Sequence, residues 1–246
     1  EGQTRRIYLE EISNPQGIIS KDYCEKVNIR PREEILDIIE NRSISCKIKR
    51  DDEYGDPYIQ ENDIFALCLV LSQNLQNFYE LEITNHILNA SQMSMLSSAI
   101  RTNHTLQRLI LINNSIDDQG AQTLAIALQD NPNIKEINLS HKGNIWVQSC
   151  IENRIKDIGA ESISLAVFSS TCDVVKINLS KNQIEQDFFG SVLKRKLRII
   201  CPNLLRKQAI QELDLSYNQY SADSIETLMR GASKSKTLKK LHLAVR

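Results

Sequence analysis

Apolar residues recur along this chain in a short pattern, apolar-x-x-apolar-x-apolar, with a period near 28 residues. The copies begin at Phe78, Leu106, Ile134, Val174, Ile210 and Leu238. Alternation within each copy places its second and third apolar residues on one face of a short strand. Because a unit of this length cannot bury its apolar face alone, a fixed period predicts coils stacked into a solenoid with one continuous core.

Each unit is expected to run from a strand through a turn and a helix to a return loop. In one copy, Leu109 and Leu111 form the buried side of the strand, and Asn114 follows at the turn. The amide of such an asparagine can bond backbone groups of neighbouring coils. From Asp117 apolar residues follow at helical spacing, and Pro132 comes after the helix. An acidic residue suits the positive end of a helix dipole, so the helix is predicted to start there.

The helical strings carry a resemblance to a known family. The string Gly120-Ala121-x-x-Leu124-Ala125-x-Ala127-Leu128 is echoed by Gly159-Ala160-x-x-Ile163-x-x-Ala166-Val167. Both strings resemble ribonuclease-inhibitor-like leucine-rich repeats, found also in the sensor regions of NOD-like receptors and in effectors of intracellular bacterial pathogens. The resemblance implies an α/β leucine-rich repeat solenoid, a horseshoe arc with parallel strands on the concave face and helices on the convex face. It also implies that the concave face binds another protein.

The repeat frame divides the chain into two parts. Residues 43–246 are expected to form the leucine-rich repeat domain with about seven strands, the first a degenerate copy around Cys46. Residues 1–42 are expected to form an N-terminal helical cap, because Pro31 can open a helix that covers the first coil. Two gaps between copies exceed the period, which predicts inserts near 143–154 and 190–207.

The outward positions of the seven strands form three rows when they are written in register. The first row is Ser45, Glu80, Arg108, Glu136, Lys176, Glu212 and Lys240. The middle row is Lys47, Glu82, Ile110, Asn138, Asn178, Asp214 and His242. The third is Lys49, Thr84, Ile112, Ser140, Ser180, Ser216 and Ala244. Neighbours in a row lie about 4.8 Å apart. The alternating charges of the first row are interpreted as self-neutralisation along the sheet in preference to partner binding.

A binding site is expected around Ile110 and Ile112, which the register leaves exposed near the centre of the concave face. Exposed apolar anchors dominate many interfaces, although scattered apolar surface residues are also ordinary. Trp146 has two interpretations, contact with a partner and packing over the edge of its own coil. The predicted partner-binding residues are Ile110, Ile112, Glu82, Arg108, Asn138, His141, Trp146, Asn178, Asp214, Tyr217 and His242.

The near-neutral charge argues against nucleic acid or an anionic membrane as a ligand, and the lack of catalytic motifs argues against an enzyme. A net charge of −1 gives no general attraction to nucleic acid or to an anionic membrane. The chain lacks the phosphate-loop, zinc-protease and serine-hydrolase motifs, so no catalytic residue, metal or cofactor is expected. The basic stretch 194–198 is interpreted as a solvated helix face, with an anionic ligand as the alternative. The apolar run 64–71 is too short to span a membrane.

The predicted function is a non-enzymatic module, monomeric in isolation, that docks one partner protein. Six dispersed cysteines favour a reduced, cytoplasmic protein. One finer hypothesis is an inhibitor or regulator that occludes an enzyme's active site, and a bacterial effector in the host-cell cytosol is one form of it. The alternative is a sensor or adaptor fragment whose activity lies in other domains of a larger protein. An enzyme with an unrecognised cysteine–histidine site is the remaining rival.

Overall fold

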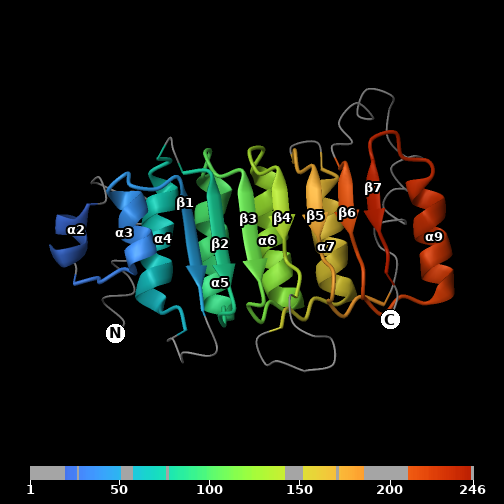
Figure 1. Cartoon of the computed structure of the whole chain (residues 1–246), viewed down its shortest axis with the longest axis horizontal. Helices are drawn as coiled ribbons and strands as arrows, with labels where there is room; N and C mark the ends of the chain where they lie inside the picture. The colour runs from blue at the N-terminus through green and yellow to red at the C-terminus, as the bar shows by residue number, and fades with distance from the viewer. Residues whose placement is uncertain are drawn as a thin grey trace.

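A computed structural model describes residues 20–26, 28–50, 58–75, 78–141, 152–169, 172–185 and 210–244. Its strands lie side by side in one row, with the helices behind them (Figure 1). The strands are β1 (Ser45–Lys49), β2 (Glu80–Thr84), β3 (Arg108–Ile112), β4 (Glu136–Asn138), β5 (Lys176–Asn178), β6 (Glu212–Asp214) and β7 (Lys240–His242). The helices are α2 (Lys21–Lys26), α3 (Glu33–Ile39), α4 (Glu61–Ser72), α5 (Ala90–Thr102), α6 (Asp118–Asp130), α7 (Asp157–Val167) and α9 (Ala222–Ala232).

The seven strands form one parallel sheet in the order β1 to β7, which confirms the predicted solenoid. Leu81 pairs with Leu109, and Leu109 pairs with Ile137 on the next strand. At the other end of the sheet, Leu213 pairs with Leu241. The first and middle rows written from the sequence are confirmed along all seven strands. A one-residue error would have turned every side chain to the other face.

The core lies between the sheet and the helices. Leu109 and Leu111 of β3 are fully buried in one hydrophobic cluster with Leu124 of α6. Helix α6 begins after Asp117, whose Oδ1 accepts a hydrogen bond from the backbone N–H of Gly120 at 3.0 Å. This bond satisfies an amide that has no partner within the helix. The coil therefore has the strand, turn and capped helix that its sequence predicts.

Buried asparagines after the strands join successive coils. Asn114 donates from Nδ2 to the Ile83 carbonyl of the preceding coil at 2.7 Å. In the coil of β4 the same role belongs to Asn153, whose Nδ2 donates to the Leu111 carbonyl at 2.7 Å. Asn153 lies near the end of the insert predicted at 143–154, and residues 142–151 lie outside the described ones. This end of the predicted insert thus supplies a structural residue of the repeat.

A second link between coils runs through the helix N-termini. Asp118 of α6 accepts at Oδ1 from the backbone N–H groups of Lys156 and Gly159, at 2.8 and 2.9 Å. A Cβ at Gly159 would lie 2.7 Å from that Oδ1 and 2.9 Å from the Ala121 Cβ. Gly159 therefore permits the close approach of α6 and α7.

Gly159→Ala is expected to lower stability by up to about 2 kcal/mol, since overpacking of a tight contact costs about 1–3 kcal/mol and the helix propensity of alanine returns about 1 kcal/mol. Gly120→Ala is the matched control, because its Cβ would meet only the Ile116 Cγ2 tightly, at 3.1 Å. Alanine also gains about 1 kcal/mol of helix propensity over glycine, so the control should be close to neutral. Urea denaturation measures both; equal midpoints for the two variants would contradict the packing argument.

Helix α3 packs against β1 at the N-terminal end of the sheet. Its residues Ile35 and Ile38 are buried, and so are Cys46 and Ile48 of β1. Residues 1–19 and 27 lie outside the described ones. The boundary between a helical cap and the repeats, predicted at 42/43, stays a prediction.

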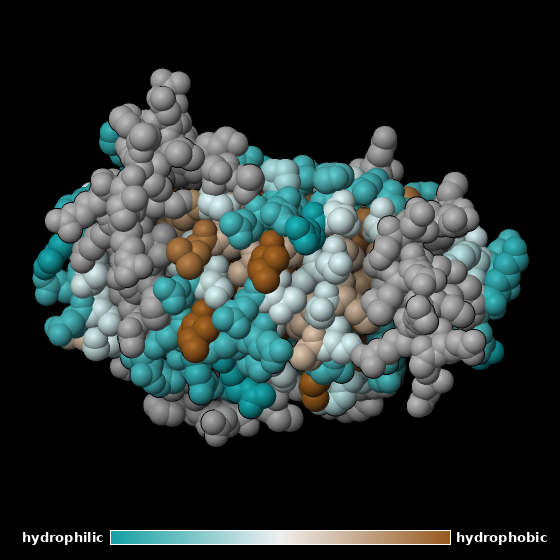
Figure 2. Space-filling view, turned by 180° about the vertical axis from the view of Figure 1, so that it is seen from behind, coloured by the Kyte–Doolittle hydropathy of each residue, from teal (hydrophilic) through white to brown (hydrophobic). Residues whose placement is uncertain are grey.

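The helix face carries separate hydrophobic residues among hydrophilic ones (Figure 2). Large exposed hydrophobic residues on α6 and α7 are Ile126, Ile158 and Leu165. Isolated apolar residues of this kind are ordinary on a protein surface. None of the helices in the described ranges is both long and apolar enough to cross a membrane.

Candidate functional site

The face of the sheet that points away from the helices, called here the strand face, carries the predicted binding residues of the strands. In the N-terminal half of the strand face, charged side chains pair with one another. Glu80 is buried and accepts from Lys47 Nζ at 2.8 Å and from the Arg108 guanidinium. Arg108 also bonds Glu136, with Nε 3.0 Å from Oε2. The hydrogen bond to Glu136 is the main reason that the pKa of Arg108 is raised. Arg108 is thus engaged within the sheet.

Glu82, another predicted binding residue, is also buried. Its carboxylate accepts from Lys49 Nζ at 3.1 Å and from the Thr84 hydroxyl at 3.3 Å. The charge of Glu82 is therefore balanced within the sheet, although the self-neutralisation interpretation applies to the first row and not to the middle row to which Glu82 belongs.

The prediction that Ile110 and Ile112 are exposed is wrong. Their exposed fractions are 9% and 1%. Ile110 stands between Glu82 and Asn138 in the register, and Ile112 stands beside Thr84. Neighbouring strands lie only about 4.8 Å apart, so the side chains of Glu82, Thr84 and Asn138 lie directly beside these two isoleucines. These two residues do not form an apolar patch for a partner.

The C-terminal half of the strand face, from β4 to β7, presents a row of polar groups. Asn138, Asn178 and Asp214 are register partners and are partly exposed. Each accepts at Oδ1 from the backbone N–H two residues later, at 3.1, 2.9 and 3.0 Å. The amide donors are Ser140, Ser180 and Ser216, so the motif is Asn/Asp-x-Ser on three successive strands. Within the described residues the side-chain NH₂ groups of Asn138 and Asn178 make no hydrogen bond.

Charges border this polar row. Glu212 lies between Lys176 and Lys240, with carboxylate–ammonium distances of 3.4 and 2.9 Å. The hydrogen bond from Lys240 and the charge of Lys176 hold the pKa of Glu212 below its ordinary value. His242 continues the polar row on β7 and is exposed. The structure therefore brings Asn138, Asn178, Asp214 and His242 together.

Two other predicted binding residues lie just after strands, at the edge of the strand face. His141 is buried; its Nδ1 lies 2.8 Å from the Asn113 Oδ1 and its Nε2 lies 3.5 Å from the Glu152 Oε1. Tyr217 is partly exposed, and the Lys181 Nζ lies 5.7 Å from its ring centroid.

Asn113 and Lys181 were not among the predicted site residues. Their position in the repeat could have identified them, since both directly follow a third-row residue, as His141 and Tyr217 do. Trp146 lies outside the described residues.

The described cysteines and His86 have structural environments. Cys24, Cys46, Cys68 and Cys172 are buried and form no disulfide. Burial raises the pKa of Cys68 to about 12 and also raises that of Cys46, which disfavours the reactive thiolate. His86 accepts at Nδ1 from the Ile59 N–H at 3.0 Å. Across the parts of the chain that the structure describes, no group of three histidine, cysteine or acidic side chains could hold a metal ion.

Comparisons with known proteins agree with the repeat architecture. A family model described as Leucine Rich repeat matches residues 102–125. NACHT, LRR and PYD domains-containing protein 14 of Mus musculus is 26% identical over 144 residues, 58% of this chain and 13% of that protein. Its Homo sapiens counterpart is 26% identical over 133 residues, 54% of this chain and 11% of that protein. This chain thus matches only a small part of these relatives.

Among solved structures, Leiomodin-1 Actin-Binding Site 2 (ABS2) is similar with a TM-score of 0.48 and 18% sequence identity. The alignment covers 72% of this chain and 90% of that one.

Proposed function

We propose that this chain, built from stacked repeats that resemble leucine-rich repeats, is a non-enzymatic module that binds a partner protein through β4 to β7 of the strand face. The observation that carries the proposal is the row of Asn138, Asn178 and Asp214, each fixed by a bond to its own backbone. Side chains that are ordered before binding lose little conformational entropy when a partner arrives. The two amide NH₂ groups would donate to acceptors on the partner.

The dimensions of this surface suit a protein better than a small molecule. Four strands separated by about 4.8 Å span about 14 Å across the row. The rim charges on Lys176, Glu212 and Lys240 extend it, and a standard interface needs about 800 Å² on each partner. A polar row with paired rim charges is typical of a specific, reversible interface and gives less support to a hydrophobic obligate one.

Asn138→Asp combined with Asn178→Asp should weaken partner binding at least tenfold. Each aspartate keeps the Oδ1 that accepts from the serine N–H, but it replaces the amide donor by a carboxylate. Affinity capture with the whole chain would supply the partner, and titration calorimetry would compare the affinities. Gln119→Glu with Gln122→Glu adds the same two charges to exposed positions of α6 and should not change binding. If the asparagine variant bound as tightly as the unaltered chain, the proposed site would be wrong.

Two finer roles remain as proposals. In the first role, the chain would inhibit an enzyme by occluding its active site, and a bacterial effector is one such case. This role is supported by the resemblance of the repeats to ribonuclease-inhibitor-like repeats and to those of pathogen effectors. The sensor or adaptor role is favoured by relatives whose names join leucine-rich repeats to NACHT and PYD domains. The complete reading frame discriminates between these roles. An intracellular, reduced location is proposed from the buried cysteines without disulfides.

A further inference from the structure

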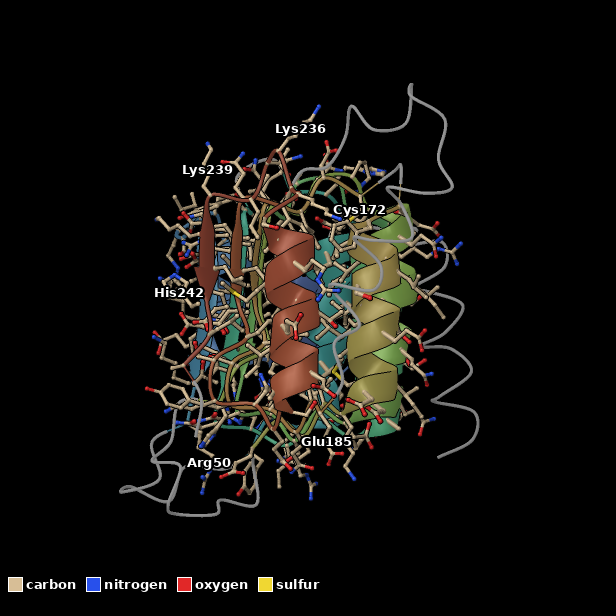
Figure 3. All side chains as sticks on the ribbon, turned by 90° about the vertical axis from the view of Figure 1, so that its right-hand side faces the viewer. Arg50, Cys172, Glu185, Lys236, Lys239 and His242 are labelled. Atoms are coloured by element: carbon tan, nitrogen blue, oxygen red, sulfur yellow. The ribbon has the colours of Figure 1, made fainter. Side chains whose placement is uncertain are left out.

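A ladder of hydrogen bonds joins four coils along the edge of the sheet at which the strands end. Its members directly follow the third-row residues of β1 to β4 and are Arg50, Asn85, Asn113 and His141. Asn85 donates from Nδ2 to the Arg50 carbonyl at 3.0 Å, and Asn113 donates from Nδ2 to the Asn85 Oδ1 at 2.8 Å. The His141 Nδ1 lies 2.8 Å from the Asn113 Oδ1. Figure 3 labels Arg50 at this edge, opposite the edge that carries Lys239.

The direction of this ladder fixes a hydrogen on one nitrogen of His141. The Arg50 carbonyl can only accept, so the NH₂ group of Asn85 faces it and the Oδ1 of Asn85 faces Asn113. By the same argument the Oδ1 of Asn113 faces His141. This oxygen also only accepts, so the His141 Nδ1 carries a hydrogen whenever the bond is made. Nε2 is therefore the nitrogen at which His141 gains or loses a proton.

Nε2 of His141 faces a carboxylate. It lies 3.5 Å from the Glu152 Oε1, and the His141 side chain is only 4% exposed. A neutral Nε2 would direct its lone pair at an oxygen that has no hydrogen to donate. A protonated Nε2 makes an ion pair with Glu152 instead. Since a histidine binds a proton roughly 100-fold more tightly than a glutamate does, the proton of this pair belongs to His141.

The surroundings of the ring decide between two opposing effects on its pKa. Burial alone lowers the pKa of a histidine, and an opposite charge within about 4–6 Å raises it. Asn113 and Glu152 each offer an oxygen to the ring, and only the doubly protonated ring donates to both. The other charges in the flanking segments are Arg154, which is exposed, and Lys181, whose Nζ lies 5.7 Å from the ring centroid of Tyr217 in the β6 coil. The carboxylate therefore outweighs burial.

We propose that His141 and Glu152 form a pH-sensitive clamp, an ion pair that fastens the segment before α7 to the edge of the sheet. Asn153, the residue after Glu152, donates to carbonyls of the β3 and β4 coils, so the clamp holds the residue that completes the β4 coil. A histidine whose pKa is raised on folding stabilises the fold fully below about pH 6.5, its unfolded value. This contribution is lost as the pH rises through the pKa of the folded state. The clamp is therefore closed in mild acid and open in alkali.

NMR titration of the isotope-labelled whole chain measures the pKa of each of its four histidines, and His141→Asn identifies the His141 signal by its loss. The pKa of His141 should lie above about 6.5, and Glu152→Gln should lower it by about 1 or more. Glu161→Gln removes a partly exposed carboxylate from α7 and should leave it unchanged. A pKa of His141 below its ordinary value, or one that ignores Glu152→Gln, would overturn the proposal.

Urea denaturation at about pH 6 and about pH 9 gives a second test, because these conditions lie on either side of the expected transition. In mild acid the unaltered chain should be more stable than Glu152→Gln, since only a carboxylate pairs with the charged ring. In alkali this advantage should vanish or reverse, because the glutamine NH₂ can donate to the neutral Nε2. A stability difference that is the same at both pH values would refute the clamp.

His141→Asn shows whether His141 is the titrating group. Asparagine occupies the equivalent place in the two preceding coils, so this variant can keep the ladder while removing the imidazole. In the His141→Asn background, Glu152→Gln should change stability by the same amount at both pH values. If its effect still depended on pH there, the titration would belong to another group and the proposal would be wrong.

Discussion

Leu109→Asp should abolish the cooperative unfolding transition of this protein. Leu109 is fully buried on β3, in the middle of the sheet. Truncation of a buried leucine alone costs about 2–5 kcal/mol, and an unpaired carboxylate in an apolar core adds a further penalty. The total approaches the whole stability of a typical domain, about 5–15 kcal/mol. Thermal denaturation followed by circular dichroism would measure the loss.

The control for this prediction is Gln107→Asp, which places the same charge two residues earlier at an exposed position. Its melting temperature should stay within a few degrees of that of the unaltered chain. A native-like transition for Leu109→Asp would mean that the strand register, and with it the assignment of both faces of the sheet, is incorrect.

Asn153→Ala should have the next largest effect, because the buried Asn153 makes hydrogen bonds to the coils of both β3 and β4. Its Oδ1 accepts from the N–H groups of Asn114 and Ile116, at 2.9 and 3.0 Å. Its Nδ2 donates to the carbonyls of Leu111 and Leu139, at 2.7 and 3.0 Å. A buried polar group left without a partner costs about 1–3 kcal/mol. The variant should therefore lose at least about 3 kcal/mol, or roughly 6–12 °C in melting temperature.

Asn62→Ala is the matched control, since Asn62 is exposed on α4 and does not bond the backbone groups that Asn153 joins. It should melt like the unaltered chain. If Asn153→Ala also melted like the unaltered chain, the hydrogen bonds by which Asn153 joins the β3 and β4 coils would be unimportant to stability.

Much of the fold was predictable because the repeat constrains it strongly. The spacing of the apolar residues identified the strands, and the two-residue alternation fixed which side chains enter the core. The repeated pattern then aligned the strands, so Glu80 was expected beside Arg108 and Asp214 beside His242, as they are. Each of these inferences depends only on neighbours along the chain or one period away.

The site was less predictable because exposure depends on groups that are not adjacent in sequence. Alternation turns Ile110 and Ile112 away from the core but does not show how closely neighbouring side chains surround them. The role of Asn153 was hidden by the insert, because its carbonyl partner Leu111 lies 42 residues away. His141 similarly gains its environment from Asn113 of the preceding coil and from Glu152 in the predicted insert.

The sequence by itself therefore determined the period, the strand register, the buried leucines and the alternating charges, since these follow from local spacing. Only the tertiary structure decided which side chains of the strand face are buried and which asparagine completes the β4 coil. The physical reason is that burial and hydrogen-bond satisfaction are set by all the atoms around a group, most of which come from other coils.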